Sequence, residues 1–264
     1  MACFQIGAAV AKGLFPAVGP QGATTLRLCL GGAMLLAVAQ PWRRWPRQAP
    51  LLPLIGLAVA MAGTILLFYL AIERLPLGVA IALQFLGPLS VAVLGSKRAA
   101  DLLWAVLAGL GVWLLVGPTP VGKALDPVGV VFALSAAAGW ASYMLLGRIT
   151  GSAFGRSAAA LSVSIAGLLI LPVGMAHAGT ALLNVELLPV ALAVALFSAA
   201  VPFSLELYAL PRLPARTFAV FTSLEPAFGV IFGFLILGEV LAWTQLAGVS
   251  MVIIAAAGAA WRAP

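Results

Sequence analysis

Charged side chains are scarce in this sequence. Only 8% of its 264 residues are Asp, Glu, Lys or Arg, whereas 64% are hydrophobic. Soluble globular proteins carry about 25% charged residues. A soluble chain of this composition has too little polar surface to cover its apolar side chains, so the composition excludes a soluble globular protein and indicates a chain that lies in the lipid bilayer.

Residues that bind metals or form disulfides are also few. The sequence has one histidine, His177, and two cysteines, Cys3 and Cys29, which both fall in apolar runs. A free cysteine in such surroundings behaves as a small hydrophobic residue, and these positions provide no zinc-ligand spacing. The Gly-x-x-x-x-Gly-Lys-Ser/Thr loop is absent, so direct use of ATP by this chain is unsupported. We expect no metal site, no cofactor and no disulfide, and we place His177 in a loop.

Long apolar runs, by contrast, fill the chain. Crossing the hydrocarbon core takes about 20 mostly apolar residues in a helix. Seven runs of that size contain no charged residue: 51–72, 75–96, 102–122, 127–147, 157–176, 187–205 and 240–261. Three more contain charged residues: 1–15 has Lys12, 23–40 has Arg27, and 215–237 has Glu225 in its interior and Arg216 at its start. The pattern predicts an all-α polytopic membrane protein with about ten transmembrane helices.

The first of these runs is short for a membrane span, because only about fifteen residues precede Pro16. No basic leader or cleavage-site pattern accompanies it, so a signal peptide is not expected. We therefore expect the first helix to lack part of its length.

Basic residues alternate between the predicted loops. Every second loop, together with the C-terminus, holds the larger set: Arg43, Arg44, Arg47, Lys97, Arg98, Arg148, Arg156, Arg212, Arg216 and Arg262. The intervening loops hold only Arg74 and Lys123. Because cytoplasmic loops are enriched in Lys and Arg, both termini are predicted to be cytoplasmic. Membrane orientation also accounts for the net charge of +7, so the expected partner is the bilayer and not a nucleic acid. Five tryptophans at predicted span ends are expected to anchor at the membrane interface: Trp42, Trp45, Trp104, Trp243 and Trp261.

The second half of the sequence repeats features of the first at a constant spacing. Arg74-Leu75-Pro76 recurs as Arg212-Leu213-Pro214, and the same spacing pairs Pro88 with Pro226, Gly95 with Gly233, and Asp101 with Glu239. This spacing is 138 residues, and we call it the repeat offset. Each half holds five spans, an odd number, so the second half must insert with the opposite orientation. We predict two inverted five-helix repeats, over residues 1–122 and 126–264. Inverted repeats are the usual construction of secondary transporters.

A carboxylate lies near the middle of the ninth predicted span. Glu225 is costly at this depth, which calls for a reason. Pro226 cannot donate to the carbonyl of Thr222, and in the matching fourth span Pro88 cannot donate to the carbonyl of Gln84. Two interrupted helices at corresponding places in two halves indicate a transporter binding site. We interpret these residues as the site; the alternative is a structural glutamate that fixes helix packing.

Three further charged residues fall within spans. Lys12 and Arg27 could reach the headgroups, neutralise a buried carboxylate, or hold a substrate carboxylate; for Lys12 we favour the headgroups, and for Arg27 the alternatives stay open. Glu206 follows Pro202 near the cytoplasmic end of the eighth span. Its depth favours the interface, and the alternative is a gating or proton-coupling carboxylate.

Two aromatic residues in the sixth span lie away from both interfaces. Trp140 and Tyr143 share one helix face at three-residue spacing. Packing between helices is the commoner role of such a pair, and lining a cavity is the alternative that we carry forward.

Eight stretches spread over the whole chain carry a family resemblance. They are 11–16 (AKGLFP), 26–28 (LRL), 68–70 (FYL), 76–80 (PLGVA), 202–206 (PFSLE), 212–218 (RLPARTF), 223–227 (SLEPA) and 237–239 (LGE). With these motifs the chain resembles the threonine/homoserine exporter family, EamA-domain proteins of the drug/metabolite transporter superfamily. The resemblance implies a bacterial inner-membrane protein with ten helices in two EamA repeats that exports amino acids. In that family the position of Gln84 is often glutamate, so the neutral amide here removes one proton acceptor from the implied site.

The leading hypothesis is a secondary exporter of small neutral amino acids that works by alternating access. Glu225, Gln84, Thr222 and Arg27 would bind the substrate with Trp140 and Tyr143, and the gating or proton-coupling candidates are Glu206, Glu225, Pro226 and Pro88. A different cargo, such as a drug or a purine, is the alternative on the same fold. An intramembrane enzyme would need a Ser/His pair or two aspartates within the bilayer, which the predicted spans lack. A helical scaffold without transport would not explain two broken helices beside a mid-membrane carboxylate.

Overall fold

A computed structural model describes residues 2–44, 49–94, 102–116, 125–209, 211–213 and 221–262. The regular secondary structure in these segments is entirely helical. The α-helices are α1 (Ala2–Lys12), α2 (Phe15–Ala39), α3 (Leu51–Arg74), α4 (Leu77–Gln84), α5 (Leu86–Leu94), α6 (Leu102–Val116), α7 (Pro127–Phe154), α8 (Ser157–Ala178), α9 (Leu188–Ala195), α10 (Val201–Ala209), α12 (Glu225–Leu237) and α13 (Trp243–Arg262). Short 3-10 segments are η1 (Pro41–Arg44), η3 (Gly179–Leu183) and η4 (Val185–Leu187), and a π-helical turn, η5 (Leu196–Ala200), joins α9 to α10.

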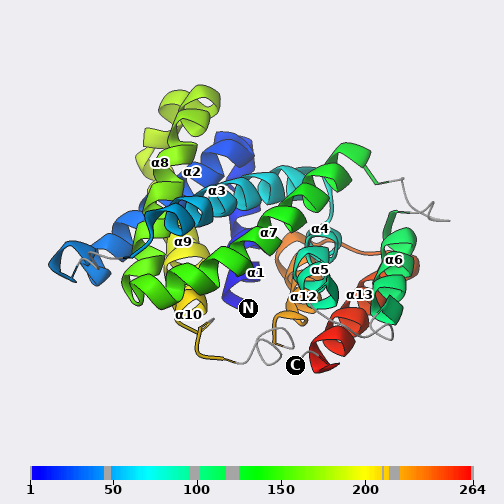
Figure 1. Ribbon diagram of the computed structural model, residues 1–264. Helices are drawn as coiled ribbons and strands as arrows, with labels where there is room; N and C mark the ends of the chain where they lie inside the picture. The colour runs from blue at the N-terminus through cyan, green and yellow to red at the C-terminus, as the bar shows by residue number, and fades with distance from the viewer. Residues whose placement is uncertain are drawn as a thin grey trace.

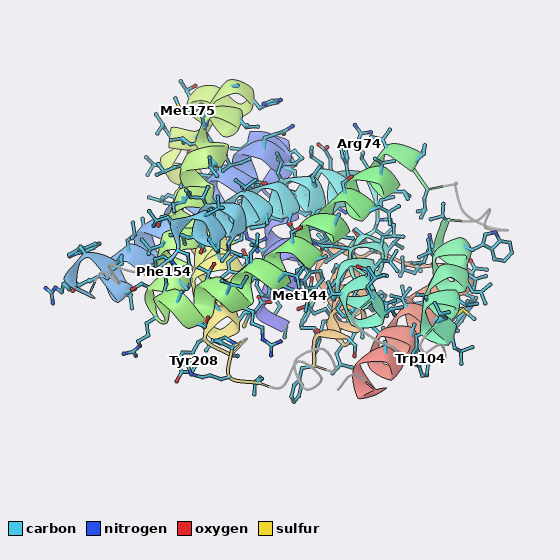
Figure 2. The ribbon with its side chains drawn as sticks, viewed as in Figure 1. Arg74, Trp104, Met144, Phe154, Met175 and Tyr208 are labelled. Atoms are coloured by element: carbon cyan, nitrogen blue, oxygen red, sulfur yellow. The ribbon has the colours of Figure 1, made fainter. Side chains whose placement is uncertain are left out.

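These helices account for the predicted membrane spans. Five helical stretches are long and apolar enough to cross a bilayer: Phe15–Arg43, Leu51–Arg74, Pro127–Phe154, Ser157–Leu183 and Val185–Ala209. Shorter apolar helices match the other five runs: Ala2–Lys12, Leu77–Val91, Leu102–Val116, Glu225–Leu237 and Trp243–Ala259. Large apolar side chains such as that of Leu168 are exposed, and Met175 projects from the outer surface, where lipid would surround it (Figure 2). The prediction of an all-α polytopic membrane protein is confirmed.

Some helix boundaries differ from the predicted ones. The helix α2 already begins at Phe15, with a kink where Gly19 adopts φ +67°, a backbone conformation that glycine adopts readily. The helix α7 continues past Arg148 until Gly155 ends it at φ +53°. The helix α8 likewise continues until Gly179, at φ +52°. The predicted loop position of His177 is therefore wrong: this residue lies in the last turn of α8, with Nδ1 2.9 Å from a carbonyl oxygen of its own helix.

Part of the loop pattern falls outside the described residues. Six positions used for the predicted orientation and interface belong to this group: Trp45, Arg47, Lys97, Arg98, Lys123 and Arg216. The orientation of the termini therefore stays a prediction.

Helices at equivalent places in the two halves pack against each other. Along α2 and α8, Gly22 meets Ala178, Gly174 meets Thr25, and Gly167 meets the backbone at Cys29. Residue numbers rise along α2 as they fall along α8, so the two helices are antiparallel. Glycine allows the backbones to approach this closely, as is usual between membrane helices.

A second equivalent pair, α6 and α13, lies side by side at the opposite edge of the molecule (Figure 1). Gly111 and Gly248 bring the two backbones into contact, and the ring of Trp104 covers Gly258. This pair is antiparallel as well. Trp104 thus stands at the predicted end of its span, but its ring packs between helices and does not extend freely to the headgroups.

Contacts between other helices are also related by the repeat offset. The helix α3 packs along α7, with Thr64 against Gly139 (Figure 1). The repeat offset relates α7 to α1, and α3 to the segment that contains η5. These two segments are also in contact, with Gly7 of α1 against Ser198 of η5. Antiparallel pairing of equivalent helices is what a two-fold axis in the membrane plane produces, so the halves are inverted. The repeat boundaries, 1–122 and 126–264, stay a prediction.

Two large clusters of buried hydrophobic residues, and a small third one formed by α5, α6 and α13, stabilise the fold. One large cluster centres on α1, α4 and the end of α3, and the other lies among α2, α3, α7, α8 and α10. Trp140 packs against both clusters. Members of both clusters line one pocket: Ala8 and Phe68 come from the first cluster, and Met61 and Phe203 come from the second.

Candidate functional site

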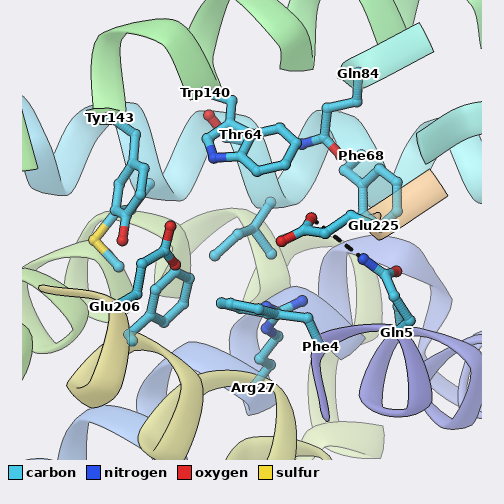
Figure 3. A pocket seen from close by; sticks show the side chains of 14 residues that line it. Phe4, Gln5, Arg27, Thr64, Phe68, Gln84, Trp140, Tyr143, Glu206 and Glu225 are labelled. Carbon is cyan, nitrogen blue, oxygen red and sulfur yellow. Dashed lines mark hydrogen bonds between the residues drawn. The ribbon is translucent and has the colours of Figure 1, made fainter. Parts of the chain in front are cut away.

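A pocket lies at the centre of the helix bundle (Figure 3). It has about 80 Å³ of space for the centres of water molecules, and one water needs roughly 10–15 Å³ on this measure. Several waters or a small solute therefore fit. Its lining side chains come from seven helices: Phe4, Gln5, Ala8, Arg27, Met61, Thr64, Ile65, Phe68, Gln84, Trp140, Tyr143, Phe203, Glu206 and Glu225.

The two halves contribute equivalent positions to this pocket. The repeat offset relates Gln5 of α1 to Tyr143 of α7, and Phe68 of α3 to Glu206 of α10. The pocket therefore lies between the halves, and the polar groups on its two sides differ. Gln5 carried no signal that we recognised in the sequence; its equivalence to Tyr143 under the repeat would have pointed to it.

Glu225 occupies the first position of α12. The chain is helical at 221–222, turns at 223–224 and becomes helical again at Glu225, with Pro226 in the first turn. The side chain is only 5% exposed, and its Oε2 accepts a hydrogen bond from Gln5 Nε2 at 3.4 Å. A helix N-terminus carries partial positive charge, which favours a carboxylate there.

The matching interruption is present in the first half. The helix α4 ends at Gln84, Phe85 forms a turn, and α5 starts at Leu86 with Pro88 in its first turn. Pro88 has no N–H to donate to the carbonyl of Gln84. Gln84 lines the pocket, whereas Thr222 is buried beside Glu225 but does not belong to the lining.

Arg27 is fully inside the bundle, at 4% exposure. Its guanidinium donates to the hydroxyl of Tyr69 at 3.1 Å and to the carbonyl oxygen of Ser198 at 2.6 Å. Pro202, four positions later, has no N–H to donate to that carbonyl. Of the three roles considered for Arg27, reaching the headgroups is excluded. In the part of the chain that the structure describes, the guanidinium forms no ion pair with a carboxylate.

Aromatic rings surround this guanidinium. The centroids of the Phe4, Tyr69 and Phe203 rings lie 5.9, 5.4 and 5.9 Å from its central carbon, within the range of cation–π attraction. The rings and the two hydrogen bonds together replace the water that the cation loses on burial. They also hold Arg27 at the edge of the pocket.

Glu206 faces the pocket, so our preference for an interfacial position was wrong. The residue is 8% exposed and lies opposite the side chain of Tyr143 (Figure 3). The physical reason is the π-helical turn η5 before α10, because a π turn holds more residues than an α turn and so rotates the helix that follows. Trp140 and Tyr143 also line the pocket, and the Trp140 ring packs edge-on against Phe85 at 5.5 Å.

Lys12 pairs with a carboxylate, which is the second of the three roles considered for this residue. Its Nζ lies 2.6 Å from Oε1 of Glu239. A partner 227 positions away cannot be inferred from the local sequence. In the described part of the chain no group of three or more His, Cys, Asp or Glu residues could hold a metal ion.

A bundle of apolar helices in two inverted halves, with a charged pocket buried between them, is the architecture of a secondary transporter. The chain belongs to the EamA-like transporter family, whose signature matches residues 127–261. It is 44% identical over 261 residues to the threonine/homoserine exporter RhtA of Escherichia coli K12, covering 98% of this chain and 88% of that protein. The RhtA protein of Salmonella typhimurium SL1344 is 43% identical with the same coverage. The predicted family resemblance is confirmed.

The fold also matches a solved crystal structure with a TM-score of 0.64. That match covers 97% of this chain and 95% of the other, at 17% sequence identity. At this level of identity the likeness supports the fold alone.

Proposed function

We propose that this protein exports small amino acids of the threonine and homoserine kind across the bacterial inner membrane by alternating access. The observation that carries the proposal is the pocket between the inverted halves, which combines carboxylates with a guanidinium in otherwise apolar surroundings. An amino acid carries one ammonium and one carboxylate group, so both of its charges find a counterpart there. The names of the similar exporters point to the same cargo, and no observation favours a drug or a purine instead.

Each end of the substrate has a partner in this proposal. Glu225 and Glu206 attract the ammonium group, with the amide of Gln84 and the backbone carbonyl to which Pro88 cannot donate as further acceptors. Arg27 attracts the substrate carboxylate, and Trp140 and Tyr143 shape the wall beside the side chain. Thr222 contributes its carbonyl next to Glu225, and this requires a small movement, because Thr222 lies just outside the present lining.

The broken helices give the proposal a means of movement. A helix that lacks one hydrogen bond bends more easily, and Pro88 and Pro226 place such a point in each half. Because Glu206 and Glu225 face one cavity, either is a candidate for exchanging a proton for substrate. We propose that both termini are cytoplasmic, as the distribution of basic residues predicts. The proposal needs no catalytic residue.

Threonine efflux from proteoliposomes tests the function. The wild-type protein should release preloaded threonine and homoserine faster than empty liposomes, and Glu225→Gln should reduce the rate at least tenfold, since an amide of the same shape cannot attract an ammonium group by charge. The matched control is Glu186→Gln, because Glu186 is exposed in η4; its rate should stay within twofold of wild type. Undiminished efflux by Glu225→Gln would remove Glu225 from the mechanism, and no efflux by the wild type would refute the function.

A further inference from the structure

Three helices are tied together at one end of the molecule by a single carboxylate. Glu239, just after α12, accepts from Lys12 Nζ at the end of α1 and from the backbone N–H of Leu77 at the start of α4, at 2.6 and 2.7 Å. Lys12 Nζ also lies 3.5 Å from the carbonyl oxygen of Leu75. We call this group of Lys12, Glu239 and the Leu77 N–H the clasp.

Local structure holds Glu239 in place. Gly238, at φ +66°, follows the last residue of α12, and the N–H of Glu239 bonds back to the carbonyl of Gly233 at 3.0 Å. This is the arrangement of a glycine C-cap, which fixes the residue that follows it. The carboxylate meets the N-terminus of α4 and the ammonium group meets the C-terminus of α1, so both helix dipoles favour the pairing.

The clasp and the pocket involve the same three helices. Gln5 of α1, Gln84 of α4 and Glu225 of α12 line the pocket, and in each helix the other end reaches the clasp. The helix α12 packs against both α1 and α4. Fully buried apolar residues, among them Ala11 and Ile81, fill the bundle between pocket and clasp. No solute can pass this way while α12 stays joined to α1 and α4.

The inverted repeat gives the other end of the pocket no equivalent lysine. The repeat offset relates Lys12 to Thr150, a buried and uncharged residue of α7. The clasp is therefore one of the features that make the two ends of the molecule unequal.

We propose that Lys12 and Glu239 are gating residues of the transport cycle: their ion pair closes the pocket toward the membrane face that holds Lys12, and it breaks when the pocket opens to that face. The proposal rests on the transport function proposed above. Helices α1 and α4 come from the first half and α12 from the second, so opening at this face means separation of the halves where the clasp joins them.

Accessibility of a pocket residue tests the gate without measuring transport. In a chain with Cys3→Ser and Cys29→Ala, the substitution Ala8→Cys places one thiol in the pocket lining. A membrane-impermeant thiol reagent, applied from the face that holds Lys12, should modify this thiol slowly. Lys12→Met or Glu239→Gln should raise the rate at least tenfold. Leu183→Cys, an exposed position in η3, confirms which face the reagent reaches.

The matched control is the second ion pair at this end. Arg74 and Asp126 lie 2.8 Å apart but are exposed. The hydrogen bond from Arg74 keeps the pKa of Asp126 below its usual value, so Asp126→Asn removes a full charge at neutral pH. Asp126→Asn and Arg74→Met should change the Ala8→Cys rate by less than twofold. An equal rise in these controls, or no rise in the clasp variants, would overturn the proposal.

Two further measurements distinguish loss of the gate from misfolding of a variant. Glu239→Gln can still accept from the Leu77 N–H, so it keeps the helix cap while it loses the charge. In the double variant Lys12→Cys/Glu239→Cys, a short bifunctional thiol reagent should stop threonine efflux, whereas a monofunctional reagent should not; efflux that continues after cross-linking contradicts the gate. A parent protein that exports no threonine refutes the proposed function, whereas an exporting parent with unchanged Ala8→Cys reactivity refutes only the gate.

Discussion

At the scale of single residues, the pocket depends on how the protein keeps a cation inside the membrane. A charged side chain at this depth is costly unless polar groups replace its water. Arg27 has the carbonyl of Ser198, to which Pro202 cannot donate, and the hydroxyl of Tyr69. The turn before α10 thus provides an acceptor for an arginine in α2.

The hydroxyl of Tyr69 should contribute measurably to stability. Tyr69→Phe removes it and leaves one guanidinium N–H without its partner. Hydrogen bonds to charged groups contribute about 1.5–3 kcal/mol in soluble proteins, and those within membranes about 0.6–2 kcal/mol, so we expect a loss of about 1–2 kcal/mol. Thermal unfolding in detergent measures the change. Tyr208→Phe is the control, since Tyr208 is half exposed, and an equal effect of both variants would contradict the role of Tyr69.

At the scale of helices, close packing depends on glycines that face a neighbouring backbone. Gly111 and Gly248 meet between α6 and α13, and Gly87 of α5 touches the carbonyl of Ala137 in α7. Van der Waals contact of this kind is a main source of stability between helices in a membrane. The backbone at Gly87 also adjoins the interruption at Phe85, so its position fixes the start of α5 just after the pocket residue Gln84.

A methyl group at Gly87 should therefore be poorly tolerated. The Cβ of Gly87→Ala would overlap the Ala137 carbonyl, and overpacking of this kind costs typically about 1–3 kcal/mol. Gly63→Ala in α3 is the matched control, because nothing lies within 4 Å of a Cβ at that position. Unfolding midpoints in detergent should fall for Gly87→Ala and stay level or rise for Gly63→Ala. A stable Gly87→Ala variant would mean that α5 and α7 are farther apart than described.

At the scale of the whole molecule, two halves with one architecture carry different polar groups. Equivalent helices pair as antiparallel neighbours, yet Gln5 corresponds to Tyr143, Phe68 to Glu206, and Lys12 to Thr150. The shared architecture gives both ends of the pocket a similar way to open. The differences between the halves concentrate charge in the pocket and at the clasp.

The inverted arrangement makes a prediction about sidedness. With both termini cytoplasmic, alkaline phosphatase fused after Pro264 should be inactive, because this enzyme folds only outside the cytoplasm, and a fluorescent protein fused there should be bright. Fusions at Leu183 of η3 should give the opposite result. Phosphatase activity at the C-terminus would reverse the proposed orientation, and it would place Lys12 and Glu239 on the cytoplasmic face.

The sequence by itself determined the features that the bilayer imposes locally. A membrane span must be a long apolar stretch, so ten runs predicted ten helices. A proline lacks its N–H wherever it stands, so Pro88 and Pro226 predicted the two interruptions beside Gln84 and Glu225. The repeat offset predicted the inverted halves independently of any contact between them.

Only the tertiary structure decided which polar groups meet. Lys12 and Glu239 are 227 positions apart, and no local pattern specifies such a pairing. Glu206 faces the pocket because a π turn rotates α10, and Arg27 finds its acceptor in a different half of the chain. The packing of distant helices decides where a buried charged side chain points and which group it pairs with. A charged group that has lost its water must bind a polar atom, and packing decides which polar atoms lie within reach.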